Sequence, residues 1–263
     1  MNKETLLEQI LVKLFRIPAI KNYWDRNYKA LEFKNTPWTK LEKPLKDSKI
    51  VLITTGGIHL KSDKEFDLSD PNGDSTFRRI PYDSNIKDLI ITHKYYDHHD
   101  ADRDPNLILP IEVLNELQSE GIVGPSCENH YSFMWHVEEP HLTTLIQKSS
   151  VEAAKEIRQQ KTDIALLVPA WGICNQTVGL VQREVERQGI STVGISIARS
   201  VSESVKPPRT YYLKYPFGHA MGEAFNMPQQ KKIFLDCLKI LETETEPGKI
   251  FDSKYRWKRH KFE

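Results

Sequence analysis

The sequence predicts an α/β fold with a mainly parallel, Rossmann-like sheet and helices on both faces. Two observations lead to this prediction. Apolar runs of strand length, without an alternating polar face, are separated by segments of helical periodicity. One such run, 164–168, is followed by a helix-patterned segment and then by a β-branched run at 192–197. A strand, a helix and a parallel strand in this order form a right-handed crossover, the unit from which such sheets are built.

Length and charge restrict the class of protein. A chain of 263 residues can hold one large α/β domain or two smaller ones. Its net charge of +1 provides no overall field for nucleic acid or an anionic membrane, and no apolar run is long enough to span a bilayer. The first residues mix acidic and basic side chains without a small-residue cleavage site, so we expect a cytoplasmic protein without a signal peptide. Three scattered cysteines argue against a disulfide framework.

Three parts are expected along the chain: an N-terminal helix and extended arm at 1–48, an α/β domain at 49–245, and a basic tail at 246–263. Apolar residues at helical spacing predict the helix over 5–15, which ends before Pro18. The aromatic, proline-punctuated arm is expected to lie across the domain or to form an oligomer contact. The tail is expected to be solvated.

The first strand is predicted at 49–55 and leads directly into Gly56, Gly57 and His59. Glycines at a strand end let the backbone approach a ligand closely, so their N–H groups are candidates for binding a substrate carboxylate. A tight turn with an incidental histidine is the alternative. The polar loop at 61–83 is long, and such loops in compact domains are more often functional than idle.

A second strand is predicted at 88–92, followed by the densest run of histidine and aspartate in the chain. His93, His98 and Asp102 are candidate metal ligands, although no fixed-spacing zinc motif is present and a solvated loop would have the same composition. Helices are predicted over 110–117, 151–160 and 231–241. The stretch at 126–141 has no strong periodicity.

The turn of the central strand–helix–strand unit contains Trp171, Gly172, Ile173 and Cys174. A helix N-terminus offers free N–H groups and a positive dipole end, so the pKa of Cys174 is expected to be lowered, with Asn175 and Thr177 as candidate caps. A small packed residue is the alternative, and Cys127 could supply a second thiol facing it. Parallel strands share a carboxyl edge, so we expect the strand ends at Thr55, Thr92 and Pro169, with their loops, to face Cys174 across one cleft.

Several ordered blocks resemble a known family. They are VLITTGG, DPNLILPIEVLNEL, WGICNQTVGLVQREVERQGI and YPFGHAMG, between Lys49 and Leu241, with PWTKLEKPL before them. In this order they resemble the selenoprotein B subunits of glycine, sarcosine and betaine reductases, and most of all the shorter D-proline reductase-type subunits.

The resemblance implies reductive cleavage of a carbon–nitrogen bond by a selenocysteine at the first position of a U-G-x-C pattern. In this chain that position is Trp171. Tryptophan has no nucleophilic or redox-active atom, so of the pair only Cys174 remains. Selenocysteine is read from UGA, one base from the tryptophan codon, and the sequence leaves open whether Trp171 is native or a recoded selenocysteine.

Taken together, these features predict an oxidoreductase that binds a small amino acid or amine. The candidate catalytic residues are Trp171, Cys174, His59 and His93. The candidate substrate-binding residues are Thr55, Gly56, Gly57, Gly172, Asn175, Gln176, Thr177, Asp104 and Asn106. A metal-dependent enzyme and a catalytically silent binding subunit are the alternatives. No cofactor is assigned apart from a divalent metal in the second alternative, and the expected partners are a thiol or redox protein or a second reductase subunit, in an oligomer.

Overall fold

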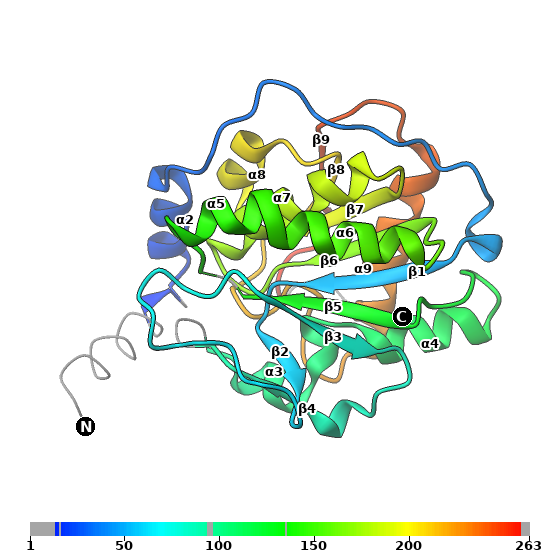
Figure 1. Cartoon of the computed structure of the whole chain (residues 1–263), viewed down its shortest axis with the longest axis horizontal. Helices are drawn as coiled ribbons and strands as arrows, with labels where there is room; N and C mark the ends of the chain where they lie inside the picture. Colours follow the sequence, from blue (N-terminus) through cyan, green and yellow to red (C-terminus); the bar gives the residue numbers. More distant parts are fainter. Residues whose placement is uncertain (1–13, 16, 94–96, 135, 259–263) are drawn as a thin grey trace.

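The computed structural model describes residues 14–15, 17–93, 97–134 and 136–258. Within them, a seven-stranded sheet has the order β3-β5-β1-β6-β7-β8-β9, and a two-stranded sheet pairs β2 with β4. All neighbours in the large sheet are parallel except β3 and β5. Helices cover both faces of this sheet (Figure 1). The predicted α/β class and mainly parallel sheet are confirmed.

The strands are β1 (Ile50–Thr54), β2 (Ile58–Leu60), β3 (Phe77–Pro81), β4 (Leu89–Ile91), β5 (Asn129–Phe133), β6 (Ile164–Val168), β7 (Ser191–Ser196), β8 (Arg209–Tyr212) and β9 (Lys249–Asp252). The α-helices are α2 (Pro18–Asn27), α3 (His99–Arg103), α4 (Ile111–Ser119), α5 (His141–Thr144), α6 (Ser150–Gln159), α7 (Cys174–Arg187), α8 (Arg199–Val205) and α9 (Met227–Thr243). Short 3-10 turns lie at Leu45–Asp47, Ile86–Asp88 and Pro105–Leu107, and a π-helical turn at Leu145–Ser149 joins α5 to α6.

Two hydrophobic cores lie on the two faces of the sheet, and β1 contributes to both. Successive side chains of a strand point to opposite faces. Ile50 and Leu52 belong to the core that includes residues of α4 and α9, whereas Val51 and Ile53 belong to the core that includes residues of α6, α7 and α8. This double burial explains why the strand sequence is a continuous apolar run.

The central unit folds as predicted. β6, α7 and β7 follow one another, and β6 pairs in parallel with both β1 and β7. Gly189, two residues after the end of α7, has a φ of +80°, a conformation that suits the end of a helix and that glycine adopts readily. The helices predicted over 110–117, 151–160 and 231–241 correspond to α4, α6 and α9.

The strand predicted at 88–92 has a different partner from the one expected. It forms β4, which pairs with β2 in antiparallel fashion outside the large sheet. Its apolar residues are only partly buried, apart from Leu89. Thr92 therefore does not end a strand of the parallel sheet, and that part of the prediction is wrong.

Four strands of the large sheet, β3, β5, β8 and β9, were not predicted. β5 occupies the stretch without periodicity, β3 lies inside the expected polar loop, and β8 is only four residues long. β9 lies within the predicted basic tail and pairs with β8 as the last strand of the sheet.

The arm does cross the domain, as its composition indicated. The helix predicted over 5–15 lies outside the described residues except for its last two positions, and the structure instead has α2, which begins at Pro18 and was not predicted. After α2 the chain runs over α8 and α7 (Figure 1). The Phe33 N–H donates to the Ser204 carbonyl, and Thr39 bonds to both the side chain and the carbonyl of Glu186.

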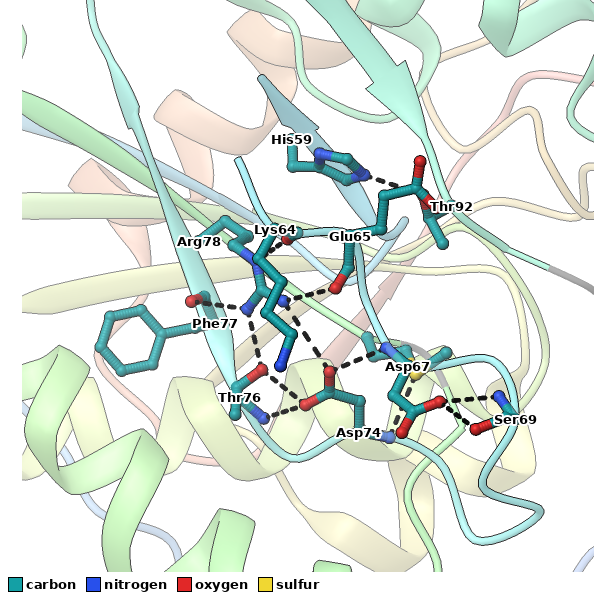
Figure 2. Close-up of polar contacts among 11 residues, drawn as sticks. His59, Lys64, Glu65, Asp67, Ser69, Asp74, Thr76, Phe77, Arg78 and Thr92 are labelled. Carbon is teal, nitrogen blue, oxygen red and sulfur yellow. Dashed lines mark hydrogen bonds and ion pairs between the residues drawn. The ribbon is translucent and has the colours of Figure 1, made fainter. Parts of the chain in front are cut away.

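The loop at 61–83 is organised around Arg78. Its guanidinium donates to the carbonyls of Lys64 and Glu65 at 2.7 and 3.0 Å, and Thr76 lies between it and the carboxylate of Asp74 (Figure 2). The same guanidinium lies 4.2 Å from the centre of the Phe66 ring. These contacts give a long polar segment a fixed conformation. In the described part of the chain, no helix has the length and apolar character needed to cross a membrane.

Candidate functional site

A cavity of about 530 Å³ opens at the carboxyl edge of the sheet, beside Trp171. The expectation of a shared edge holds for the first and central units, since the Thr55 N–H donates to the Val168 carbonyl at 3.2 Å. Ligand sites of open α/β sheets lie at this edge, where loops diverge from the strand ends. Trp171 follows β6, and Phe217 and His219 follow β8.

One part of the cavity wall is aromatic. It consists of Phe15, Trp171, Phe217, Phe225 and Trp257. The Trp171 ring, on a residue that is 7% exposed, lies 5.2 Å from the ring of Phe15, 5.7 Å from Trp24 and 5.6 Å from Phe217. Aromatic pairs at these separations are stabilising beyond their buried area. Position 171 therefore contacts the cavity on one side and an aromatic cluster on the other.

Another part of the wall is ionisable. It consists of Asp97, Asp100, Arg103, His219, Glu223 and Lys258, and Pro216 and Ala224 complete the lining. His219 Nε2 lies 3.0 Å from Asp100 Oδ2, and this hydrogen bond holds the pKa of Asp100 below its usual value. The Gly218 N–H donates to the Ala170 carbonyl at 2.7 Å, which fixes the loop after β8 against the turn that carries Trp171.

Cys174 is buried behind this wall and has no exposed surface. Its thiol donates to the Thr55 carbonyl at 3.3 Å. Burial raises the pKa of Cys174 to about 12, although hydrogen bonds, including the one with Thr55, act in the opposite direction. The expected lowering at a helix N-terminus is therefore wrong, because desolvation of the thiolate outweighs the favourable backbone groups.

The other two thiols do not complete a reactive pair. Cys127 belongs to the core on the opposite face of the sheet from Cys174 and bonds to Thr162. Burial raises the pKa of Cys127 to about 11 and that of Cys237 well above its usual value. The alternative in which Cys127 faces Cys174 is wrong.

Polar residues at the start of α7 hold the turn together. Asn175 Nδ2 donates to the carbonyls of Trp171 and Gly172 at 2.7 and 2.9 Å, and its Oδ1 accepts from the Ile197 N–H. Gln176 accepts from the Leu31 N–H of the arm, and Thr177 is almost fully buried. Gly172 is required by close packing, because a Cβ there would lie 2.4 Å from Trp24. These residues position Trp171, and among the sequence-predicted site residues only Trp171 lines the cavity.

The glycines after β1 are used by the protein itself. The Gly56 N–H donates to Thr54 Oγ1 and the Gly57 N–H to the Phe133 carbonyl, both at 3.1 Å. Gly57 has a φ of +67°, and a Cβ there would lie 2.6 Å from the Thr92 carbonyl oxygen. The expected carboxylate site is therefore not formed by these two N–H groups, because both are already hydrogen-bonded.

The two histidines chosen from the sequence lie away from the cavity lining. His59 has no exposed surface, donates through Nδ1 to the Leu60 carbonyl and bonds through Nε2 to the Thr92 hydroxyl at 2.8 Å (Figure 2). His93 is 6% exposed, and its pKa lies well below the usual value because of burial and, to a lesser degree, the neighbouring His98 and His136. A neutral, buried imidazole is poorly placed to exchange protons with a ligand.

Asp104 and Asn106 form a structural junction. Asp104 Oδ2 accepts from the Phe225 N–H and from Gln230 Nε2, both at 2.7 Å, and Oδ1 accepts from Asn106. Asn106 in turn bonds to both the backbone and the side chain of Glu112 at the start of α4. These two residues support the loop that carries Phe225, which lines the cavity. Both carboxylate oxygens of Asp104 and both amide atoms of Asn106 already have protein partners.

The metal alternative receives no support from the described residues. Among them, no group of three or more histidine, cysteine, aspartate or glutamate side chains is arranged to hold a metal ion. His98 Nδ1 lies 2.7 Å from Asp102 Oδ2, an exposed pair on one helical turn. His93 lies in the buried interior nearby.

Sequence reasoning missed most of the cavity. His219 stands in the block YPFGHAMG, directly after glycine and two residues after an aromatic, and this context could have indicated it. Asp100 and Arg103 were hidden among many polar residues of one loop. Trp257 and Lys258 belong to the tail that was expected to be solvated, but Tyr255 bonds to Asp236 at 2.7 Å and the Trp257 ring lies 4.9 Å from that of His219.

Comparisons with known proteins agree with the resemblance found in the sequence. The model of the glycine/sarcosine/betaine reductase selenoprotein B family matches residues 20–170, a range that stops one residue before Trp171. The chain is 32% identical to the D-proline reductase subunit gamma of Acetoanaerobium sticklandii, over 84% of this chain and 89% of the relative. No solved structure matches the chain.

More distant relatives are longer. The chain is 25% identical to the glycine reductase complex component B subunit gamma of Peptoclostridium acidaminophilum, over 88% of this chain and 54% of the relative. It is 22% identical to the sarcosine reductase complex component B subunit beta of the same organism, over 87% of this chain and 53% of the relative. The chain thus spans about half the length of these two proteins but most of the D-proline reductase subunit. With the family model matching more than half of its length, the chain belongs to the glycine/sarcosine/betaine reductase selenoprotein B family.

Proposed function

We propose that this chain is the substrate-binding subunit of a reductase complex that cleaves a carbon–nitrogen bond in a small amino acid or amine. The cavity beside Trp171 is the proposed substrate site. The relatives of the chain are named as subunits of D-proline, glycine and sarcosine reductases. These names support both the proposed substrate class and a second reductase subunit as the partner.

The observation that carries the proposal is the placement of residue 171. Its side chain lines the cavity, whereas Cys174, three residues later, lies behind the wall. A selenol at position 171 would reach a ligand, and the thiol of Cys174 would be its neighbour at the helix start. Reduction replaces one C–N bond by a C–H and an N–H bond, consumes two protons, and takes two electrons from a dithiol that becomes a disulfide.

The lining suits such a substrate. Carboxylates of Asp97, Asp100 and Glu223 suit an ammonium group, and the cations of Arg103 and Lys258 suit a carboxylate. Aromatic faces favour alkylated ammonium groups as well. A mixed wall of this kind therefore favours small ligands that carry charge over purely apolar ones.

A silent binding subunit is the second candidate, and the aromatic cluster favours it. Trp171 packs against Phe15, Trp24 and Phe217 at centroid distances of 5.2–5.7 Å, so the indole is accommodated rather than strained. Such a subunit would bind ligand without performing the reductive step, because an indole can neither attack carbon nor accept electrons from a dithiol.

Three proteins distinguish the candidates: wild type, a variant with selenocysteine at position 171, and that variant with Cys174→Ser. Each is incubated with dithiothreitol and D-proline, glycine, sarcosine or betaine, and the reduced product is measured by mass spectrometry. We expect product only with selenocysteine at 171, and less of it when Cys174 is serine. Binding of the same four compounds is measured separately by isothermal titration. Binding without product in every protein would favour the silent subunit, and absence of binding would contradict both candidates.

A further inference from the structure

The imidazole of His219 lies between two hydrogen-bond acceptors, the carboxylate of Asp100 and a backbone carbonyl. His219 Nε2 faces Asp100 Oδ2 at 3.0 Å, and Nδ1 faces the Phe217 carbonyl oxygen at 3.2 Å. A carbonyl oxygen and a carboxylate can only accept hydrogen bonds. A ring that carries a proton on both nitrogens would donate to both acceptors at once, and it would then form an ion pair with the carboxylate.

This hydrogen-bonded pair lies in the cavity wall and is accessible. The side chain of His219 is 17% exposed and that of Asp100 is 41% exposed. Arg103 lies 4.0 Å from the other oxygen of Asp100, and Asp97, Glu223 and Lys258 supply the remaining charges of the lining. The pair joins two segments, since Asp100 lies on α3 and His219 follows β8.

We propose that the His219–Asp100 pair is the zwitterion-binding element of the cavity, in which His219 receives the carboxylate of an amino acid and Asp100 receives its ammonium group. This inference rests on the proposed function and narrows it from amino acids and amines to ligands that carry both charges. The two groups of the pair are separated by one hydrogen bond. The ammonium and the carboxylate of an α-amino acid are separated by one carbon atom, so a single ligand can contact both His219 and Asp100.

The exchange leaves no charge without a partner. When the ligand carboxylate replaces Asp100 at His219, the ligand ammonium takes the place of His219 at Asp100. A ligand with a single charge breaks the resident pair and satisfies only one of its members. The other member is then left in a partly enclosed site, which disfavours that ligand.

Isothermal titration tests this assignment with glycine, sarcosine, betaine and D-proline as zwitterions, and with methylammonium and acetate as single-charge probes. We expect wild type to bind at least one zwitterion ten-fold or more tightly than either single-charge probe. His219→Gln, which keeps a donor but removes the charge, should weaken zwitterion binding ten-fold or more and leave methylammonium unaffected. Asp100→Asn should weaken the binding of zwitterions and of methylammonium and leave the binding of acetate unaffected.

His141 and Asp70 provide a matched control. They form a similar pair, 2.9 Å apart with side chains about one third exposed, and neither lines the cavity. His141→Gln should bind every probe as wild type does. The ¹⁵N resonances of the His219 ring provide a second readout that needs no variant, and they should show two protonated nitrogens in the ligand-free protein.

The outcomes separate this inference from the proposed function. If no zwitterion binds wild type, the proposed function fails. If a zwitterion binds wild type and both cavity variants equally, or if His219 is neutral in the ligand-free protein, the function stands and the His219–Asp100 assignment is overturned.

Discussion

The two ends of α7 bury polar groups in opposite ways. At the C-terminal end, Glu186 and Arg209 form an ion pair at 2.9 Å with side chains that are 0 and 1% exposed. Glu186 also accepts from Thr39 and Thr192, and the Arg209 guanidinium lies 3.6 Å from the centre of the Trp38 ring. This end is closed, and its polar groups fasten the arm and β8 to the helix.

At the N-terminal end, the buried polar groups hold the turn whose side chain lines the cavity. Asn175 binds the carbonyls of Trp171 and Gly172, and the side chain of Trp171 lines the space where a ligand would bind. The comparison teaches that buried polar residues on one helix can have different roles. A group whose partners are all within the protein supports the fold, whereas one that orients an accessible side chain supports a site.

The largest effect is expected from Glu186→Gln. The change leaves the guanidinium of Arg209 buried without its counter-ion, and the free energy of unfolding should fall by about 3–5 kcal/mol. Urea denaturation measures this. Arg187→Gln on the same helix, at a side chain that is 47% exposed, is the control and should change stability by less than about 1 kcal/mol. Equal stability of the two variants would remove the distinction between the two ends of the helix.

Trp171→Ala should lower the free energy of unfolding by about 3 kcal/mol, because it empties the centre of the aromatic cluster. Unlike Glu186→Gln, it should also change ligand binding, since the same ring lines the cavity. Thermal unfolding and titration with the zwitterion panel measure the two effects. Tyr23→Ala, at an exposed ring, serves as control. Unchanged ligand binding in Trp171→Ala would mean that the N-terminal end is as purely structural as the C-terminal one.

Lys21 sharpens the comparison, because its ammonium is buried without a direct carboxylate partner among its hydrogen bonds. It donates to the carbonyls of Ile197 and Tyr215, and burial lowers its pKa to about 8. Between pH 8 and the usual lysine value the unfolded chain binds more protons, so this group should add about 1–3 kcal/mol of stability as the pH rises. Lys21→Met should lack that increase, and Lys29→Met, at an exposed site, should retain it. The pH dependence of the urea midpoint, measured for wild type and both variants, tests this prediction.

Alkylation should give the smallest effect. With a pKa of about 12 and no exposed surface, Cys174 should stay unmodified by iodoacetamide at neutral pH in the folded protein, as should Cys127 and Cys237. In urea all three should react. Rapid modification of Cys174 alone in the folded state, located by mass spectrometry, would contradict this prediction and would mean that the N-terminal end of α7 carries a reactive thiol.

The sequence by itself determined the α/β class, the central crossover at 164–197, the main helices and the family. These features depend on local periodicity or on ordered blocks of residues, and both can be read along the chain. The position of Trp171 at a strand end followed in the same way. β5 and β8 escaped notice because short strands acquire their identity from the neighbours with which they pair.

Only the tertiary structure decided which residues form the cavity. Asp100, Trp171, His219 and Trp257 come from four segments of the chain, and nothing in their spacing requires them to meet. The pKa of Cys174 also depended on folding, because desolvation is set by all surrounding atoms and not by the helix start alone. Likewise, the N–H groups of Gly56 and Gly57 could be judged only when their partners were known, since a hydrogen bond to a distant carbonyl leaves no trace in the local sequence.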